Sequence, residues 1–283
     1  MRELVLSPHA ESVRSALADA PDWSGYAAEL RELLTTVIER SAADALEVGD
    51  LLVNQPLPDS RSGLRNGVEV SPSEAVDLVE GMAAGDGPYC RLSAPGRLLV
   101  VSGWEGAVHL HTTQRVAGEL AGVQGTHVDC RWRDAAPDPL DTEKLVEAVA
   151  DDRFWSAVRD MTDRVMLLCE RWAHGAFGCR WFLVTRGNVG QVAGLVRPRS
   201  LLGVVTDPDL QPRPEVLEED FTAFTAPLSP GELPYRAFPG GADDLSEVVG
   251  EGLTLVLADD ALGNWCVVPD ADGVNRGLWE DIR

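Results

Sequence analysis

Two histidines separated by a single residue, His109 and His111, are the side chains of this sequence best suited by type and spacing to hold a metal ion. Residues two apart in a strand face the same side, so their imidazoles would lie next to each other. His127, on the following predicted strand, is the candidate third ligand. The alternative, which we favour, is a set of half-buried histidines at a sheet surface with no metal, and we therefore expect no cofactor.

Other catalytic patterns are missing from the sequence. It contains no Gly-x-Ser-x-Gly nucleophile elbow, no Walker phosphate loop and no Cys-x-x-Cys pair. The stretch Asp270-Ala271-Asp272-Gly273 starts like a calcium loop, but Val274, Asn275 and Asp281 stand where further ligands, a glycine and a glutamate are required, which favours a β-turn. The catalytic residues, and whether the protein is an enzyme at all, stay unknown from sequence.

Pairs and runs of acidic residues form a second candidate site. Asp243-Asp244, Asp259-Asp260 and Glu218-Glu219-Asp220 could together present a negative face to a basic partner. Trp265 and Trp279 lie beside predicted turns and are candidate aromatic anchors for such a contact, as is Trp104. The competing interpretation is a set of solvated acidic loops.

The net charge of the chain restricts the possible partners. The 283 residues carry 46 acidic and 24 basic side chains, a formal charge of −22, with the acids scattered rather than gathered into one tail. Binding to nucleic acid or to an anionic membrane needs Lys and Arg clustered on one face, and no such cluster is present. We expect no nucleic-acid partner and no membrane partner.

Sequence features also predict where the protein resides. The N-terminus lacks a signal-peptide pattern, and no apolar run approaches 18 residues. The five cysteines are widely spaced, which suits reduced thiols, and a cytoplasmic location is expected. Lys144 is the only lysine among many arginines, a bias typical of a bacterial genome with high GC content.

Hydrophobic periodicity predicts the elements that must position these residues. Helices are expected over 7–18, 23–46 and 72–85, the last with a capping box at Ser71 and Glu74, and a short helix is expected after Thr112 or Thr113. Strands are expected over 4–6, 50–53, 89–92, 97–102, 107–111, 126–132, 179–185, 191–196, 201–205, 253–257 and 265–268. A proline-rich acidic loop is expected over 207–239.

The order of these elements favours an α+β protein with mostly antiparallel sheets and helices packed on one face. Two strand-rich halves, 1–134 and 140–283, would be joined by a long helical region over 141–172. They form either two domains or one continuous domain.

The C-terminal stretch 257–281 resembles the last strands of SUKH-type immunity proteins. The resemblance covers Leu257-Ala258-Asp259-Asp260, the stretch from Gly263 to Val268, Gly273-Val274 and Trp279-Glu280-Asp281, in which an acidic-glycine turn and a strand precede a tryptophan and a second acidic pair. The resemblance implies inhibition of a partner protein.

Three functions remain open. The first is an acidic protein-binding module, in the form of an immunity or antitoxin-like inhibitor of a basic partner. The second is an enzyme or small-molecule-binding protein of bacterial specialised metabolism, metal-dependent through the histidines if they form a site. The third is a scaffolding subunit with a large flat apolar surface.

Overall fold

The computed structural model describes residues 1–9, 23–135, 144–145, 149–197, 200–250, 252–258, 266–267 and 274–275. The chain forms two compact units: unit 1 comprises Met1–Leu52 and Leu57–Thr142, and unit 2 comprises Val53–Pro56 and Glu143–Arg283. Within the described ranges, no helix is both long enough and apolar enough to cross a membrane.

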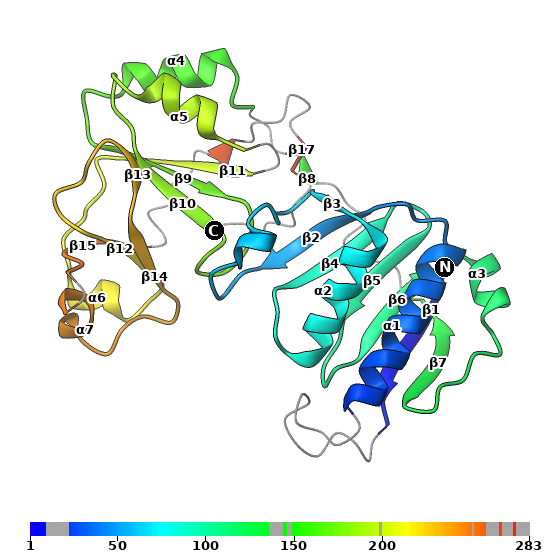
Figure 1. Cartoon of the computed structure of the whole chain (residues 1–283). Coiled ribbons are helices and arrows are strands. Elements are labelled where there is room, and N and C mark those ends of the chain that lie inside the picture. Colours follow the sequence, from blue (N-terminus) through cyan, green and yellow to red (C-terminus); the bar gives the residue numbers. More distant parts are fainter. Residues whose placement is uncertain are drawn as a thin grey trace. The chain divides into compact units, whose positions relative to one another are not determined.

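Unit 1 is a seven-stranded antiparallel sheet with helices on one face (Figure 1). Its strands run in the order β3-β2-β4-β5-β6-β1-β7. They are β1 (Arg2–Pro8), β2 (Leu46–Leu52), β3 (Glu69–Val70), β4 (Tyr89–Ala94), β5 (Leu98–Ser102), β6 (Val108–Thr112) and β7 (Val128–Asp134). The helices are α1 (Trp23–Arg40), α2 (Pro72–Ala84) and α3 (Gln114–Glu119), and a 3-10 turn spans Asp59–Arg61.

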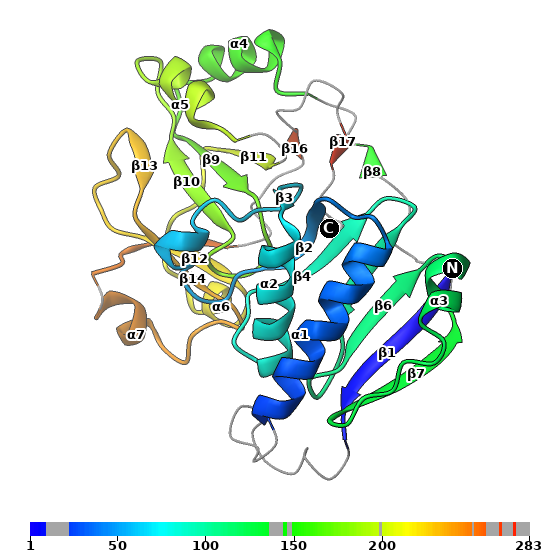
Figure 2. The same cartoon turned by 45° about the vertical axis from the view of Figure 1, so that its right-hand side comes forward.

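Helices α1 and α2 lie side by side across the sheet of unit 1 in both views (Figures 1 and 2). The buried face of α1 carries residues at helical spacing, among them Tyr26, Leu30 and Leu34, which pack toward the alternate apolar residues of the strands. The predicted capping box of α2 is confirmed: Ser71 Oγ accepts the Glu74 N–H, and Glu74 accepts the Ser71 N–H at 2.8 Å.

Unit 2 is built from four layers. Its five-stranded antiparallel sheet has the order β13-β10-β9-β11-β16, and a three-stranded sheet has the order β14-β12-β15. The strands are β9 (Met166–Arg171), β10 (Cys179–Leu183), β11 (Leu201–Thr206), β12 (Phe221–Phe224), β13 (Gly231–Leu233), β14 (Tyr235–Phe238), β15 (Leu255–Ala258) and β16 (Cys266–Val267). The helices are α4 (Asp152–Asp160), α5 (Val189–Leu195), α6 (Pro214–Leu217) and α7 (Leu245–Val249), and β8 (Lys144–Leu145) pairs with β17 (Val274–Asn275).

Three apolar clusters hold the layers of unit 2 together. Helices α4 and α5 cover one face of the five-stranded sheet through a cluster that includes Phe154 and Phe182. The three-stranded sheet covers the other face, where Trp181 meets Phe224 edge to face at 5.5 Å between ring centroids. Helices α6 and α7 cover the outer face of the three-stranded sheet around Phe221. The antiparallel α+β prediction is confirmed, but helices flank unit 2 on both sides.

The long helical region expected over 141–172 is not found. Helix α4 spans only Asp152–Asp160, and 166–171 form strand β9. Every residue of β9 from Met166 to Glu170 is buried, because this strand has a helix layer on one side and a sheet layer on the other. A strand buried on both faces shows a continuous apolar run, and the spacing of apolar residues alone cannot distinguish such a run from part of a buried helix.

Three other predictions from sequence are corrected. Ser7 and Pro8 belong to β1 and do not begin a helix, and residues 10–18 of the helix expected there lie outside the described residues. The strand expected over 191–196 is helix α5, which buries Val189 and Val192 at a spacing of three. The loop expected over 207–239 contains α6, β12, β13 and β14, whose short lengths of three or four residues hide any periodicity.

Candidate functional site

Two acidic runs that are distant in the sequence meet on unit 2. The Ala242 N–H donates to the Leu217 carbonyl oxygen at 2.9 Å, and the Gly240 N–H donates to Asp220 Oδ1 at 2.7 Å. Gly241 lies so close to Leu217 that an added Cβ would come within 2.2 Å of its carbonyl oxygen. These contacts join Glu218-Glu219-Asp220 to Asp243-Asp244, and we call these five residues the acidic surface.

All five carboxylates of the acidic surface are exposed. The surrounding segment 207–258 carries eleven acidic residues and only two basic ones, Arg213 and Arg236. Arg213 pairs with Asp209 at 2.8 Å, and the Arg236 guanidinium lies over the Phe238 ring at 4.6 Å from its centroid. The segment thus has a formal net charge of −9, and its basic residues do little to offset the acidic surface.

Two members of the acidic surface also stabilise the backbone. Asp244 is the N-cap of α7 and accepts the backbone N–H groups of Ser246 and Glu247. A hydrogen bond from the Ser246 hydroxyl, together with these two N–H groups, lowers the pKa of Asp244. Asp220 accepts the Gly240 N–H. The exposed carboxylates of Glu218, Glu219 and Asp243 are therefore the ones to alter when binding is to be tested without disturbing the backbone.

The other predicted members of this negative face, Asp259, Asp260, Trp265 and Trp279, lie outside the described residues, as does most of the stretch that resembles SUKH-type proteins. Trp104 is described and is 93% exposed at the turn between β5 and β6.

His109 belongs to a charge network on the face of the unit 1 sheet opposite α1 and α2. Its Nδ1 lies 2.7 Å from Glu3 Oε1. Arg133 donates two hydrogen bonds to the same carboxylate, from Nε at 2.7 Å and from Nη2 at 2.6 Å. Glu3 is only 4% exposed. The hydrogen bonds from Arg133 and then His109 outweigh the effect of burial and lower the pKa of Glu3 to about 2. Glu3 is thus ionised at neutral pH, so His109 Nδ1 carries the proton and donates it.

Two of the three candidate metal ligands share one face of β6, and the third lies elsewhere in unit 1. His111 follows His109 on the same face of β6 and pairs with Glu3 across the strand ladder. The His127 ring lies against Gly25 of α1, where an added Cβ would come within 2.9 Å of it. Among the residues that the structure describes, no three His, Cys, Asp or Glu side chains are placed to hold a metal ion.

The Glu3 network should make the stability of the protein depend on pH. Because the pKa of Glu3 falls from an ordinary 4.5 to about 2 on folding, its contribution is present above pH 4.5 and is lost as the pH falls toward 2. We expect the wild type to lose about 2–3 kcal/mol more unfolding free energy than Glu3→Gln over this interval. Urea unfolding at a series of pH values measures it, with Glu32→Gln as a control for the loss of one exposed carboxylate. Parallel curves for the wild type and Glu3→Gln would contradict the assignment.

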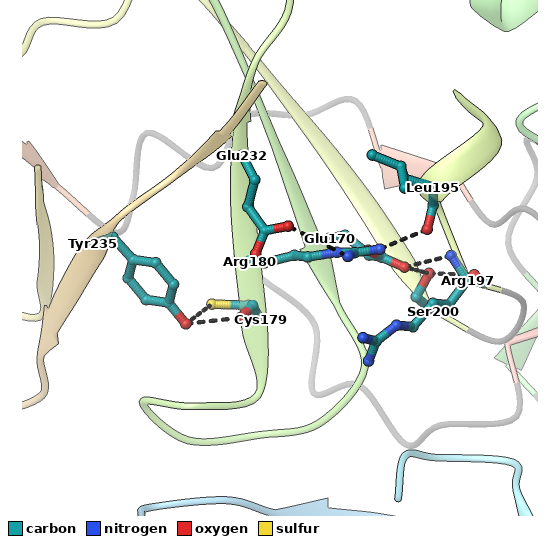
Figure 3. Close-up of polar contacts among 8 residues, drawn as sticks. All are labelled: Glu170, Cys179, Arg180, Leu195, Arg197, Ser200, Glu232 and Tyr235. Atoms are coloured by element: carbon teal, nitrogen blue, oxygen red, sulfur yellow. Dashed lines mark hydrogen bonds and ion pairs between the residues drawn. The ribbon is translucent and has the colours of Figure 1, made fainter. Parts of the chain in front are cut away.

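A second network, which sequence reasoning missed, lies in unit 2 (Figure 3). Glu170 on β9 is completely buried, and its carboxylate accepts a hydrogen bond from Arg180 Nε. It also accepts hydrogen bonds from the Arg197 N–H at 2.6 Å and from Ser200 Oγ at 3.2 Å. Arg180 Nη2 also donates to the carbonyl oxygen of Leu195, the last residue of α5, at 2.6 Å. The network ties the end of α5 to the sheet, a structural role that satisfies each buried charge.

Tyr235 on β14 makes a further contact with the five-stranded sheet (Figure 3). Its hydroxyl lies 2.8 Å from the Cys179 carbonyl oxygen and 3.2 Å from that of Ala176, and the Cys179 thiol approaches it at 3.4 Å. Burial raises the pKa of Tyr235, so the hydroxyl stays protonated and acts as the donor. This pair connects the three-stranded sheet to the five-stranded sheet.

Among the described residues of unit 2, the acidic surface is both exposed and chemically distinctive. Comparison of the chain with models of protein families, with curated proteins and with solved structures finds no match. The function has to be argued from the residues themselves.

Proposed function

We propose that this protein is a protein-binding module whose acidic surface binds a basic region of a partner protein. The observation that supports the proposal is the convergence of Glu218-Glu219-Asp220 with Asp243-Asp244, which the contact between Gly241 and Leu217 creates. Five exposed carboxylates on adjoining segments give a local negative potential that scattered charges do not.

The charge of the whole chain supports the same kind of partner. A formal charge of −22 attracts cationic proteins from a distance and repels nucleic acid and anionic lipid. The acidic surface then sets where the partner docks, and it acts on the association rate more than on the lifetime of the complex. A partner that uses its basic region on nucleic acid would be inhibited while that region is covered, which is how the protein would act as an immunity or antitoxin-like inhibitor.

The proposal is tested by neutralising the acidic surface. The purified protein is used as bait in a lysate of its own cells at low and at high salt, and the basic protein that it retains is identified. This basic protein is then produced separately, and its affinity for the wild type and the variants is measured by titration. We expect the triple variant Glu218→Gln, Glu219→Gln, Asp243→Asn to bind that basic protein about tenfold more weakly at low salt, since each exposed charge contributes about 0.2–1 kcal/mol. The difference should shrink as salt is added.

A variant of equal net charge serves as the control. Glu32→Gln, Glu39→Gln and Asp44→Asn remove three exposed acids from unit 1 and should leave the affinity within about twofold of the wild type. Equal losses in the two triple variants would mean that only total charge matters. Retention of no basic protein, or binding that is insensitive to salt, would also contradict the proposal.

A further inference from the structure

The turn between β5 and β6 presents Trp104 almost entirely to solvent. Its side chain is 93% exposed, the highest value among the large apolar side chains of the described residues. A tryptophan brings about 150–250 Å² of surface to a contact and is among the residues most often found at the energetic centre of protein interfaces. The feature to be explained is why this one is left in water.

The backbone beneath Trp104 is held in place from two sides within the turn. The Gly103 N–H donates to the Ala107 carbonyl oxygen at 2.7 Å, and the Ala107 N–H donates to that of Trp104 at 3.0 Å. Glu105 and Gly106 both have left-handed backbone angles, with φ of 55° and 77°. For a glutamate this conformation is uncommon, and the turn geometry imposes it.

Two side chains from other elements also fix the turn. The buried Tyr26 hydroxyl of α1 donates to the Gly106 carbonyl oxygen at 2.6 Å. The His109 ring, oriented by Glu3, packs against Gly103, where an added Cβ would come within 2.6 Å of Nε2. Because the turn is already ordered, a partner that contacts Trp104 loses little conformational entropy of the loop.

The chemistry of the turn selects a cation. Trp104 offers the aromatic face that binds cations best, and the exposed carboxylate of Glu105 follows it directly. The protein makes the same kind of contact internally, since the Arg197 guanidinium lies 4.9 Å from the centroid of the Trp172 ring. The negative charge of the chain as a whole brings cationic groups, not anionic ones, to this position.

We infer that the Trp104–Glu105 turn of unit 1 is a second contact site, separate from the acidic surface of unit 2, and that it binds an arginine side chain of a basic partner protein. The planar guanidinium stacks on the indole while Glu105 neutralises its charge. The inference shares with the proposed function the basic nature of the partner, but it concerns different residues and can fail separately.

A peptide of nine arginines is the probe, with a peptide of nine glutamates as the negative control. The indole N–H resonance of Trp104 is assigned in the spectrum of the nitrogen-15-labelled full chain by its loss in Trp104→Phe. We expect this resonance to shift saturably with the arginine peptide, and Trp104→Ala to weaken peptide binding about two- to fivefold. Phe177→Ala, which removes a 44% exposed aromatic that has no acidic residue next to it in the sequence, should leave binding unchanged.

The outcomes separate the two proposals. If the backbone resonances of Glu218, Glu219 and Asp243 shift while the Trp104 indole does not, the inference about the turn is wrong and the acidic surface stands. If the Trp104 indole shifts and those backbone resonances do not, the turn binds arginine and the proposed function loses its support. If neither shifts, both are wrong.

Discussion

Replacing Arg180 by methionine is expected to destabilise the protein by about 3–5 kcal/mol, which would be the largest effect of any single substitution considered. The change leaves the Glu170 carboxylate completely buried without its cation, and an unpaired buried charge carries the full cost of removal from water. It also leaves the Leu195 carbonyl oxygen at the end of α5 without the Arg180 donor. Urea unfolding at pH 7, followed by fluorescence and by circular dichroism, measures the loss.

A surface ion pair of the same unit provides the matched control. Arg164 and Asp207 approach to 3.0 Å, but their side chains are 68% and 54% exposed. Arg164→Met should therefore cost less than about 1 kcal/mol. The double variant Glu170→Met, Arg180→Met should lose less than the sum of its single variants, because removing both charges removes the unpaired one. Equal costs for Arg180→Met and Arg164→Met would show that burial of the pair contributes nothing.

The Glu170 network also shows where prediction from sequence stops. Glu170 directly follows an apolar run, and nothing in the neighbouring sequence indicates that Arg180 pairs with it across β9 and β10. The pairing depends on strand register, which the sequence does not display when both faces of a strand are buried. The same burial made β9 resemble part of a helix, whereas α2 could be predicted because Ser71, Glu74 and Gly85 mark its ends by local chemistry.

The candidate sites follow the same division between local and distant information. The acidic runs and the exposed turn at Trp104 could be identified, because each is a property of consecutive residues. The contacts around them could not be predicted. The His109 ring that packs against the turn, for example, is held by Glu3, which lies 106 residues earlier in the sequence. The acidic surface likewise depends on a contact between Leu217 and Gly241, which are separated by β12, β13 and β14.

That contact makes Gly241→Ala the substitution with the second largest expected effect, a loss of about 3 kcal/mol in unfolding free energy. Gly241 has a φ of 83°, a conformation that costs an alanine about 1–3 kcal/mol. Its new Cβ would also lie 2.2 Å from the Leu217 carbonyl oxygen, so 217–220 and 240–244 must move apart. The variant changes no charge, yet it should weaken binding of the basic partner at low salt.

Gly240→Ala is the control that separates strain from displacement. Gly240 has a similar φ of 78°, but an added Cβ would meet nothing within 4 Å. Gly240→Ala should lose only the unfolding free energy that the positive φ costs an alanine. The acidic surface should stay assembled and bind the partner as in the wild type. Urea unfolding measures the stability of both variants, and their affinity for the partner is measured by titration under conditions in which both are folded.

Loss of binding in Gly241→Ala alone would mean that the position of the carboxylates, and not their number, is what the partner recognises. Full binding by a folded Gly241→Ala would mean instead that the convergence of the two acidic runs is irrelevant to the partner.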